Sequence, residues 1–332
     1  MPDNFKAIVL NQDGENFTRE IKSIDKSFLK HGDVTVKVDY SDLNFKDGMI
    51  LKNGGRLVKE FPHIPGIDFS GTVIESENSK FKEGDEVILT GFRVGEVFYG
   101  GYSQIAKVDG NFLVKKPSNL TSKQAMILGT AGFTSLMSAF AIQAREGILL
   151  GEKVNDVLVT GATGGVGSVA VIALSKLGYN VTAVTGKDSK ADYLKSLGAK
   201  NVINRSEFDK DPKLIDKGLW DGVVDTVGGD ILFNGVKSLR YGCSLAACGL
   251  VAAPQFGASV LPFILRHVNL LGIDSVQLPL PQKTQIWSRL ATDWKLDLSE
   301  VEETLSLHDL SAAIDRILAG QMVGRGLVDL SL

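Results

Sequence analysis

The chain has 332 residues, of which 44% are hydrophobic and 23% are charged. At roughly 150 residues per domain, this length predicts about two domains with ample apolar core. The 36 Lys and Arg residues against 39 Asp and Glu residues give a net charge of −3. Because charges of one sign do not gather in blocks, the composition argues against a nucleic-acid or membrane partner and favours small molecules.

The amino-terminal segment and the longest apolar stretches predict a cytoplasmic protein without a membrane helix. Residues 1–17 lack the charged start, apolar middle and cleavage site of a secretory signal. The apolar stretches at residues 131–142 and 245–253 fall short of the about 20 residues that span a bilayer. Cys243 and Cys248 are too few for a disulfide framework or a four-cysteine zinc lobe. We expect them to be small buried side chains on opposite faces of a strand.

Up to about residue 116, short β-rich runs separated by glycine turns predict an irregular, mostly antiparallel β domain. The Thr121-Ser122-Lys123-Gln124 sequence then has the spacing of a capping box, which predicts the start of a helix over residues 125–144. Beyond it, predicted strands alternate with predicted helices. The strands are expected at 156–160, 180–185, 201–204, 222–225, 244–249 and 269–274.

Six strands interleaved with helices are typical of a doubly wound parallel sheet, because parallel neighbours need a covering crossover. After residue 281 the alternation ends, and two helices near 282–294 and 307–318 precede a closing strand at 326–330. We therefore predict an α/β protein whose domains are residues 1–122 together with 281–332, and residues 123–280.

A glycine-rich turn lies between the first of these strands and its helix. Its residues are Ala162, Thr163, Gly164, Gly165, Val166 and Gly167. Gly164 allows the backbone to approach a pyrophosphate, and Gly167 allows the helix to pack closely on the strand while its N–H groups face the anion. The surrounding βαβ pattern favours a dinucleotide site over a merely structural turn.

The end of the second strand indicates which nicotinamide cofactor binds. An NAD site would place an acidic residue there to accept from the ribose hydroxyls, whereas this strand ends with Thr185, Gly186 and Lys187. Arg205, which follows the third strand, lies at the same sheet edge and can clamp a 2′-phosphate. These residues predict NADPH as the cofactor, although Lys187 and Arg205 could each be an ordinary solvated cation.

The order of the predicted domains resembles that of the medium-chain dehydrogenase/reductase superfamily over essentially the whole chain, and four stretches support this resemblance. They are residues 63–71 (HIPGIDFSG), 84–87 (GDEV), 129–134 (GTAGFT) and 161–167 (GATGGVG). The resemblance implies a GroES-like β domain and a Rossmann domain with a six-stranded parallel sheet. The zinc alcohol dehydrogenases of this superfamily carry a cysteine near 42–47 and Gly-His-Glu at 66–68. Neither ligand is present, so the resemblance points to the zinc-free reductases, with no metal.

Further stretches are similar to the acrylyl-CoA reductase branch. They are residues 40–48 (YSDLNFKDG), 61–69 (FPHIPGIDF), 262–266 (PFILR) and 271–275 (LGIDS). In this reading Asn44 donates a hydrogen bond and Lys46 supplies positive charge to an enolate oxygen, while Asp47 orients Lys46 or relays a proton. Alternatively, Asn44 and Asp47 only shape a turn and Lys46 is a solvated cation.

The resemblance also implies residues that contact the two ligands. Thr134, Gly249, Leu250, Ile273 and Ser275 would approach the nicotinamide. Tyr40, Tyr99 and Arg325 would contact the substrate, with Arg325 as a candidate reader of a phosphate that could also be a surface residue. Tyr99 stands where the relatives are expected to carry a tryptophan.

These observations predict an NADPH-dependent reductase of short 2-enoyl-CoA thioesters, with acrylyl-CoA the first candidate. An NADPH:quinone or general enone oxidoreductase is the second reading, and a non-catalytic NADPH-binding sensor is the third. Motifs of other chemistries, HExxH, GxSxG and the P-loop, do not occur in the sequence. We expect a homodimer, the commonest assembly of such enzymes.

Overall fold

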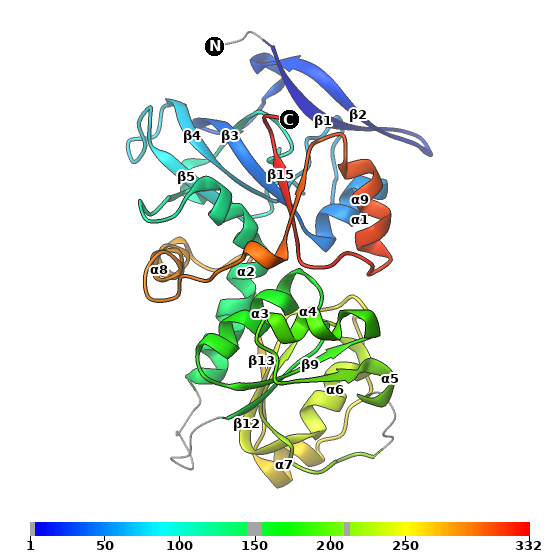
Figure 1. Ribbon diagram of the computed structural model, residues 1–332. Coiled ribbons are helices and arrows are strands. Elements are labelled where there is room, and N and C mark those ends of the chain that lie inside the picture. Colours follow the sequence, from blue (N-terminus) through cyan, green and yellow to red (C-terminus); the bar gives the residue numbers. More distant parts are fainter. Residues whose placement is uncertain (1–3, 145–154, 209–212) are drawn as a thin grey trace. The chain divides into compact units, whose positions relative to one another are not determined.

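A computed structural model describes residues 4–144, 155–208 and 213–332, and the chain divides into two compact units. Unit 1 comprises Met1–Thr130 and Val276–Leu332, and unit 2 comprises Ala131–Ser275. The chain therefore leaves the first unit, builds the second and returns (Figure 1). The domain boundaries expected from the sequence, at 122/123 and 280/281, lie eight residues before the first division and five residues after the second.

Unit 1 contains a seven-stranded, mostly antiparallel sheet in the order β14-β15-β3-β4-β5-β7, with β6 paired to β3. Its strands are β3 (Val34–Leu43), β4 (Asp68–Ser76), β5 (Glu86–Thr90), β6 (Ile105–Val108), β7 (Val114–Lys115), β14 (Glu302–Leu305) and β15 (Arg325–Asp329). A separate hairpin joins β1 (Asn4–Asp13) to β2 (Asn16–Asp25). In β3, Val36 and Val38 are buried while Lys37 between them is exposed, the alternation of a strand with one face on the core.

The helices of unit 1 are α1 (Phe45–Asn53), α8 (Leu280–Leu290) and α9 (Leu310–Leu318). Helices α1 and α9 pack closely at Gly48, where an added Cβ would lie 2.8 Å from Ile317 Cγ2. Residues 44–47, which the sequence suggested could form only a turn, instead cap and begin α1. Short 3-10 helices of unit 1 lie at Lys26–Phe28, Gly54–Arg56, Gly110–Phe112 and Ser299–Val301, and one of unit 2 lies at Asp188–Lys190.

Unit 2 is the predicted doubly wound domain, and its six-stranded sheet is parallel throughout, in the order β10-β9-β8-β11-β12-β13 (Figure 1). The strands are β8 (Asp156–Val159), β9 (Asn180–Thr185), β10 (Asn201–Asn204), β11 (Trp220–Asp225), β12 (Leu239–Ala247) and β13 (Asn269–Gly272). The helices are α3 (Gly165–Lys176), α4 (Ala191–Ser196), α5 (Arg205–Phe208), α6 (Gly229–Lys237) and α7 (Leu261–Arg266). The predicted fold class is therefore confirmed.

Helix α2 (Ser122–Gln143) carries the chain from unit 1 into unit 2. The predicted capping box opens it, with Thr121 N donating to Gln124 Oε1 and Gln124 N to Thr121 Oγ1, both at 3.1 Å. Among the described helices it alone has the length and hydropathy to cross a membrane, but 78% of its most apolar window is buried inside the protein. That burial is typical of a core helix.

Both cysteines are free and half-buried. The Cys248 thiol donates to Asp225 O at 3.3 Å, and burial raises the pKa of this thiol to about 12. A thiol with this pKa is almost wholly protonated near neutral pH, so it is a poor nucleophile.

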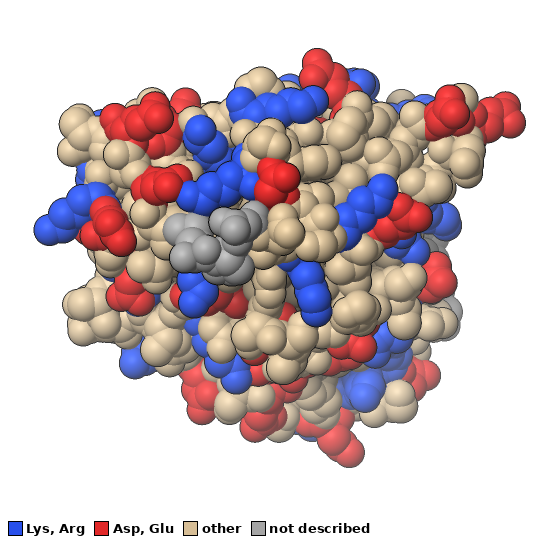
Figure 2. Space-filling model, turned by 90° about the horizontal axis from the view of Figure 1, so that it is seen from above, with Lys and Arg blue, Asp and Glu red and all other residues tan. Residues whose placement is uncertain are grey.

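Lys and Arg side chains are interspersed with Asp and Glu side chains over the face drawn in Figure 2. This mixture agrees with the near balance of the charges counted in the sequence. Such a surface gives little electrostatic attraction for polyanions.

Candidate active site

The glycine-rich turn of unit 2 connects β8 to α3. Gly161 has a positive φ of 58°, and an added Cβ on Gly167 would lie 2.3 Å from Gly161 O. Ala162 and Thr163, the first two residues of the turn, are buried. Gly164 caps α3 without a side-chain hydrogen bond, so the first N–H groups of the helix, from Gly165 and Val166 onward, are left for an anion.

Four of the predicted cofactor-binding side chains meet beside this turn. Lys187 Nζ donates to Thr163 Oγ1 at 3.2 Å, and Thr163 Oγ1 lies 3.4 Å from Thr185 Oγ1. The exposed Arg205 brings its guanidinium to 3.4 Å from the position of a Cβ on Gly186. Burial and nearby Lys190 lower the pKa of Lys187. Two cations and two hydroxyls at one sheet edge form a site that fits a phosphate group.

A second group of predicted cofactor residues follows the strand ends and α2 within unit 2. Thr134 Oγ1 donates to Ser275 Oγ at 2.8 Å, which joins two residues 141 positions apart. Ile273 N donates to Ala247 O at 3.0 Å. An added Cβ on Gly249 would lie 1.9 Å from Thr226 C, so glycine is needed where two strand-end loops touch. Leu250 beside it is 57% exposed.

In unit 1, Asn44 and Asp47 form a capping box at the start of α1. Asn44 N donates to Asp47 Oδ2 and Ile67 N donates to Asp47 Oδ1, each at 3.0 Å. The Asn44 side-chain amide uses both of its N–H groups on carboxylates, at 2.7 Å to Asp42 Oδ1 and 3.0 Å to Asp68 Oδ2. The geometry thus shows Asn44 and Asp47 shaping the chain around Lys46.

The partners in this network were not expected from the sequence. Asp68 accepts from Thr130 N at 2.7 Å and from Thr130 Oγ1 at 2.6 Å. Asp42 is paired with Arg325, which also donates to Ile127 O at 2.8 Å. The N-x-x-D spacing of residues 44–47 is a capping signal that could have been read from the sequence. The meeting of Asp42, Asp68 and Arg325 had no local signal.

The three carboxyl groups of this network are fully buried and crowd one another. Burial, and then the nearby Asp68, raise the pKa of Asp47 to about 7. The same two causes raise the pKa of Asp42 well above its usual range, against the opposing effect of Arg325. Burial of these carboxyl groups and their mutual repulsion therefore favour protonation within the network.

Lys46 points to a different partner. Its Nζ lies 2.8 Å from Glu96 Oε1, and its side chain is 30% exposed against 7% for Glu96. Lys46 is therefore accessible to a ligand, whereas Asn44 and Asp47 are buried. Glu96 is a further residue that the sequence analysis did not single out.

The three predicted substrate residues do not gather in one place within unit 1. Arg325 is 2% exposed and its guanidinium bonds to Ile127, Asn44 and Asp42, so it lies in the core and not on a surface where a phosphate could reach it. Tyr99 donates its hydroxyl to Pro62 O at 2.9 Å and stacks on Phe28.

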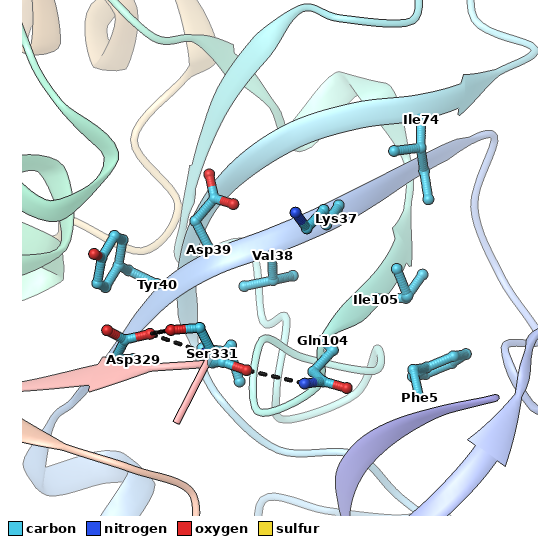
Figure 3. A pocket seen from close by; sticks show the side chains of 11 residues that line it. Phe5, Lys37, Val38, Asp39, Tyr40, Ile74, Gln104, Ile105, Asp329 and Ser331 are labelled. Carbon is cyan, nitrogen blue, oxygen red and sulfur yellow. Dashed lines mark hydrogen bonds between the residues drawn. The ribbon is translucent and has the colours of Figure 1, made fainter. Parts of the chain in front are cut away.

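Tyr40 borders a cavity of about 490 Å³ beside the middle of β3 and the end of β15 (Figure 3). Lys37, Asp39, Gln104 and Asp329 also line this cavity. Its lining, within the described chain, does not include the residues of the Asn44–Asp47 network. Among the described residues, Tyr40 thus lines a cavity that the predicted reaction residues at the start of α1 do not line.

The residues at the zinc position of the alcohol dehydrogenases do not fit a metal ion. Among the described residues, no three His, Cys, Asp or Glu side chains are arranged to hold one. Asp68 is turned toward Thr130 and Asn44, and Asp42 toward Arg325. Zinc in proteins prefers thiolate and imidazole ligands, which this network lacks.

Two family models match the chain, the alcohol dehydrogenase GroES-like domain over residues 30–118 and the zinc-binding dehydrogenase over residues 165–292. The acrylyl-CoA reductase AcuI of Ruegeria pomeroyi is 45% identical over 331 residues, which cover 98% of this chain and 99% of the relative. The chain belongs to the medium-chain dehydrogenase/reductase superfamily.

Solved structures place this superfamily member among oxidoreductases with bound nicotinamide cofactors. The yhdH oxidoreductase of Salmonella enterica in complex with NADP has a TM-score of 0.92 and 41% identity, covering 98% of this chain and 99% of that one. The yhfP protein of Bacillus subtilis with NAD bound also has a TM-score of 0.92, with 42% identity and the same coverage. Its curated name is putative quinone oxidoreductase, at 43% identity over 98% of this chain and 99% of the relative.

Proposed function

We propose that this chain is an NADPH-dependent reductase of short 2-enoyl-CoA thioesters, acting on acrylyl-CoA to form propionyl-CoA. The observation that carries the proposal is the 45% identity to an acrylyl-CoA reductase along nearly the whole chain. The resemblance of residues 40–48 and 61–69 to that branch supports the same substrate.

The cluster of Thr163, Thr185, Lys187 and Arg205 supports NADPH over NADH. NADP is bound in the Salmonella enterica relative and NAD in the Bacillus subtilis relative, so similarity alone leaves both cofactors open. Strand β9 ends in Thr185 and not in a carboxylate, so the 2′-phosphate would meet hydroxyls and cations without repulsion. When bound, the reduced nicotinamide would supply a hydride to the β-carbon of the enoyl thioester, and the resulting enolate would take a proton at its α-carbon from a side chain or water to complete the reduction.

Within unit 1, Lys46 is the proposed partner of the thioester oxygen. Negative charge develops on that oxygen during the reduction, and a fixed cation lowers the barrier to such a charge. The Lys46 side chain is 30% exposed and can donate to a ligand. The amide N–H groups of Asn44 are already donated to Asp42 and Asp68. We therefore assign Asn44 and Asp47 a positioning role at the start of α1.

A substrate panel tests this function. Oxidation of NADPH is followed by absorbance with acrylyl-CoA, crotonyl-CoA, free acrylate and a quinone. We expect kcat/KM for acrylyl-CoA to exceed that for free acrylate by at least about 100-fold, because the CoA portion contributes binding energy to the transition state. Faster turnover of the quinone would favour the second candidate, which the putative quinone oxidoreductase relative supports. NADPH binding without turnover of any of them would favour a sensor.

A substitution of Arg205 tests the preference for NADPH over NADH. Arg205→Ala should lower the ratio of NADPH to NADH affinity by about 10- to 100-fold, since a charge-assisted contact to the 2′-phosphate is lost. Lys195→Ala, at a lysine 59% exposed on α4, is the matched control and should leave the ratio unchanged. An unchanged ratio in Arg205→Ala would refute the assignment of this cluster.

We also propose a cytoplasmic homodimer, supported by the surface of unit 2. In the part of the chain that the structure describes, strand β13 lies at one end of the parallel sheet and pairs with β12 on one side only. Near it, Val260 is 66% exposed, Ile264 70%, Leu265 59% and Leu270 37%. An open strand edge beside exposed apolar side chains is a surface that a second copy can cover. An NADPH-linked reductase of a CoA thioester needs the soluble pools of both compounds, which favours the cytoplasm.

A further inference from the structure

Lys46 occupies a helical position that ordinarily disfavours lysine. It is the second residue of α1, after the cap Asn44 and Phe45. The N–H groups at a helix start carry partial positive charge, so a cation there is repelled and a carboxylate is preferred. Asp47 meets that preference one residue later. A lysine between them therefore needs a compensating partner and a reason to be present.

Glu96 is that partner, and it comes from a loop 50 residues away. Its carboxylate is buried at 5% exposure, and Oε1 lies 2.8 Å from Lys46 Nζ. The second oxygen faces Arg93, with Nε at 3.9 Å from Oε2. An ammonium has three N–H donors. The contact to Glu96 uses one of them and leaves the partly exposed side of Lys46 able to meet a ligand.

The loop that carries Glu96 has an unusual backbone. Phe92 and Arg93 have positive φ values of 51° and 61°, although neither is a glycine. Gly95, with a φ of 76°, packs so closely that an added Cβ would lie 2.7 Å from Gly66 C. Below the loop, Lys283 Nζ lies 4.1 Å from the centre of the Phe92 ring. Backbone strain of this kind persists where the surroundings hold it, and it gathers at functional sites.

We propose that Glu96 is a positioning residue that holds the Lys46 ammonium in a fixed place for the thioester oxygen of the substrate. This inference rests on the proposed function. A lysine side chain has four rotatable bonds, and without a partner its charge would spread over many positions. A buried carboxylate on a strained loop removes that freedom before the substrate binds, so the positive charge is already in place when the enolate forms.

A double-mutant cycle tests the pairing. The variants are Glu96→Gln, Lys46→Ala and the double variant, assayed with acrylyl-CoA under conditions where NADPH is saturating. Glu96→Gln should lower kcat by on the order of 10- to 100-fold with little change in NADPH affinity, because the transition-state charge loses a located cation. The double variant should be no slower than Lys46→Ala, since Glu96 acts only through Lys46.

A matched control is the exposed pair of Lys26 and Glu75, which lie 2.6 Å apart in the same unit. Glu75→Gln removes an equivalent charge and should leave kcat within about two-fold of the parent, as expected for exposed ion pairs. Glu96→Asp keeps the carboxylate and serves where Glu96→Gln folds poorly. Glu96→Asp should retain more activity than Glu96→Gln. If Glu96→Gln is insoluble, Glu96→Asp should still have a lower kcat than the parent and bind NADPH as well as the parent does.

The outcomes separate two failures. If the parent protein does not reduce acrylyl-CoA, the proposed function is wrong. If the parent is active but Glu96→Gln and Glu96→Asp keep the parent kcat, the positioning role is overturned. Losses in Glu96→Gln and Lys46→Ala that multiply in the double variant would also overturn it, because they would show that the two residues act independently.

Discussion

The Asn44–Asp47 segment shows how a residue's role depends on what surrounds it. The Asn44 side chain could donate a hydrogen bond to a substrate and the Asp47 side chain could relay a proton, but both also suit helix capping, and the structure uses both in a capping box. Lys46, between them, is the one with an accessible charged group. At the residue scale, we propose that the network at the start of α1 would support the reaction by positioning the chain, while Lys46 would supply the positive charge.

The raised pKa of Asp47 predicts a pH dependence of stability. Burial and nearby Asp68 raise this pKa from 3.8 to about 7 in the folded protein. Between these values the folded state binds a proton that the unfolded chain has lost. The contribution to stability is thus fully present below about pH 4 and is lost as the pH rises to about 7. Asp42 acts in the same direction.

Asp47→Asn should remove the contribution of Asp47 to the pH dependence of stability. We expect the fall in the free energy of unfolding between about pH 5 and about pH 7 to become shallower, by up to about 1.4 kcal/mol per pH unit. Urea unfolding at several pH values measures it. Asp192→Asn, at a fully exposed carboxylate of α4, is the control and should keep the parent slope. A parent-like slope in Asp47→Asn would contradict the prediction.

At the scale of an element, α2 is shaped by one residue. Gly129 interrupts the helix with a φ of 51° and a ψ of −160°, and Asp42 and Arg325 lie against it. The interruption directs Thr130 N toward Asp68 at 2.7 Å. A helix with continuous hydrogen bonds would instead use that N–H internally. The break in α2 thus frees the Thr130 N–H to bond Asp68, and it leaves room for the Asp42 carboxylate beside Gly129.

Gly129→Ala should be severely destabilising. An added Cβ would lie 1.6 Å from Asp42 Oδ2, a carboxylate already held by Arg325. We expect a loss of at least about 4 kcal/mol, which combines overpacking with disruption of a buried ion pair. Guanidinium unfolding measures the loss.

Gly84→Ala is the matched control for that substitution. Gly84 also has a positive φ, of 87°, but nothing lies within 4 Å of an added Cβ. Only backbone strain of about 1–2 kcal/mol is then expected. Equal losses in the two variants would show that the close approach at Gly129 is unimportant.

At the scale of the whole molecule, each unit supplies one part of the proposed chemistry. Unit 2 holds the glycine-rich turn and the cations for a phosphate, and unit 1 holds Lys46 and its supporting network. Because the carboxyl-terminal tail returns to unit 1, β15 pairs with β3 and contributes Arg325 to the network. The return of the chain to unit 1 therefore completes the buried network of Asp42, Asp68 and Arg325 in that unit.

The proposed homodimer predicts a response to charge on unit 2. In a two-fold symmetric interface each residue occurs twice, so Ile264→Arg introduces two buried charges. We expect the parent to sediment as a dimer and Ile264→Arg to sediment as a monomer in analytical ultracentrifugation. Leu332→Arg, at a residue 63% exposed in unit 1, is the control and should leave the dimer intact. A monomeric parent would refute the homodimer.

Much of unit 2 could be predicted from the sequence because its signals are local. Alternating strands and helices, the glycine-rich turn and the strand ending in Thr185 each occupy a few consecutive residues, and the six-stranded parallel sheet follows from them. The capping box at Thr121 and Gln124 is of the same kind. Local backbone preferences and hydrophobic periodicity depend on residues that are close together in the sequence.

The tertiary structure alone decided the environment of Lys46. Asp42 meets Arg325 across 283 positions, and Lys46 meets Glu96 across 50. Pairings over such distances depend on how strands are ordered and which side chains are buried together, so no short pattern encodes them. Burial then strengthens the interactions among the charges and raises the pKa of Asp47. The sequence by itself determined the scaffold and the type of cofactor turn, whereas packing decided which polar residues are supports and which one is left accessible.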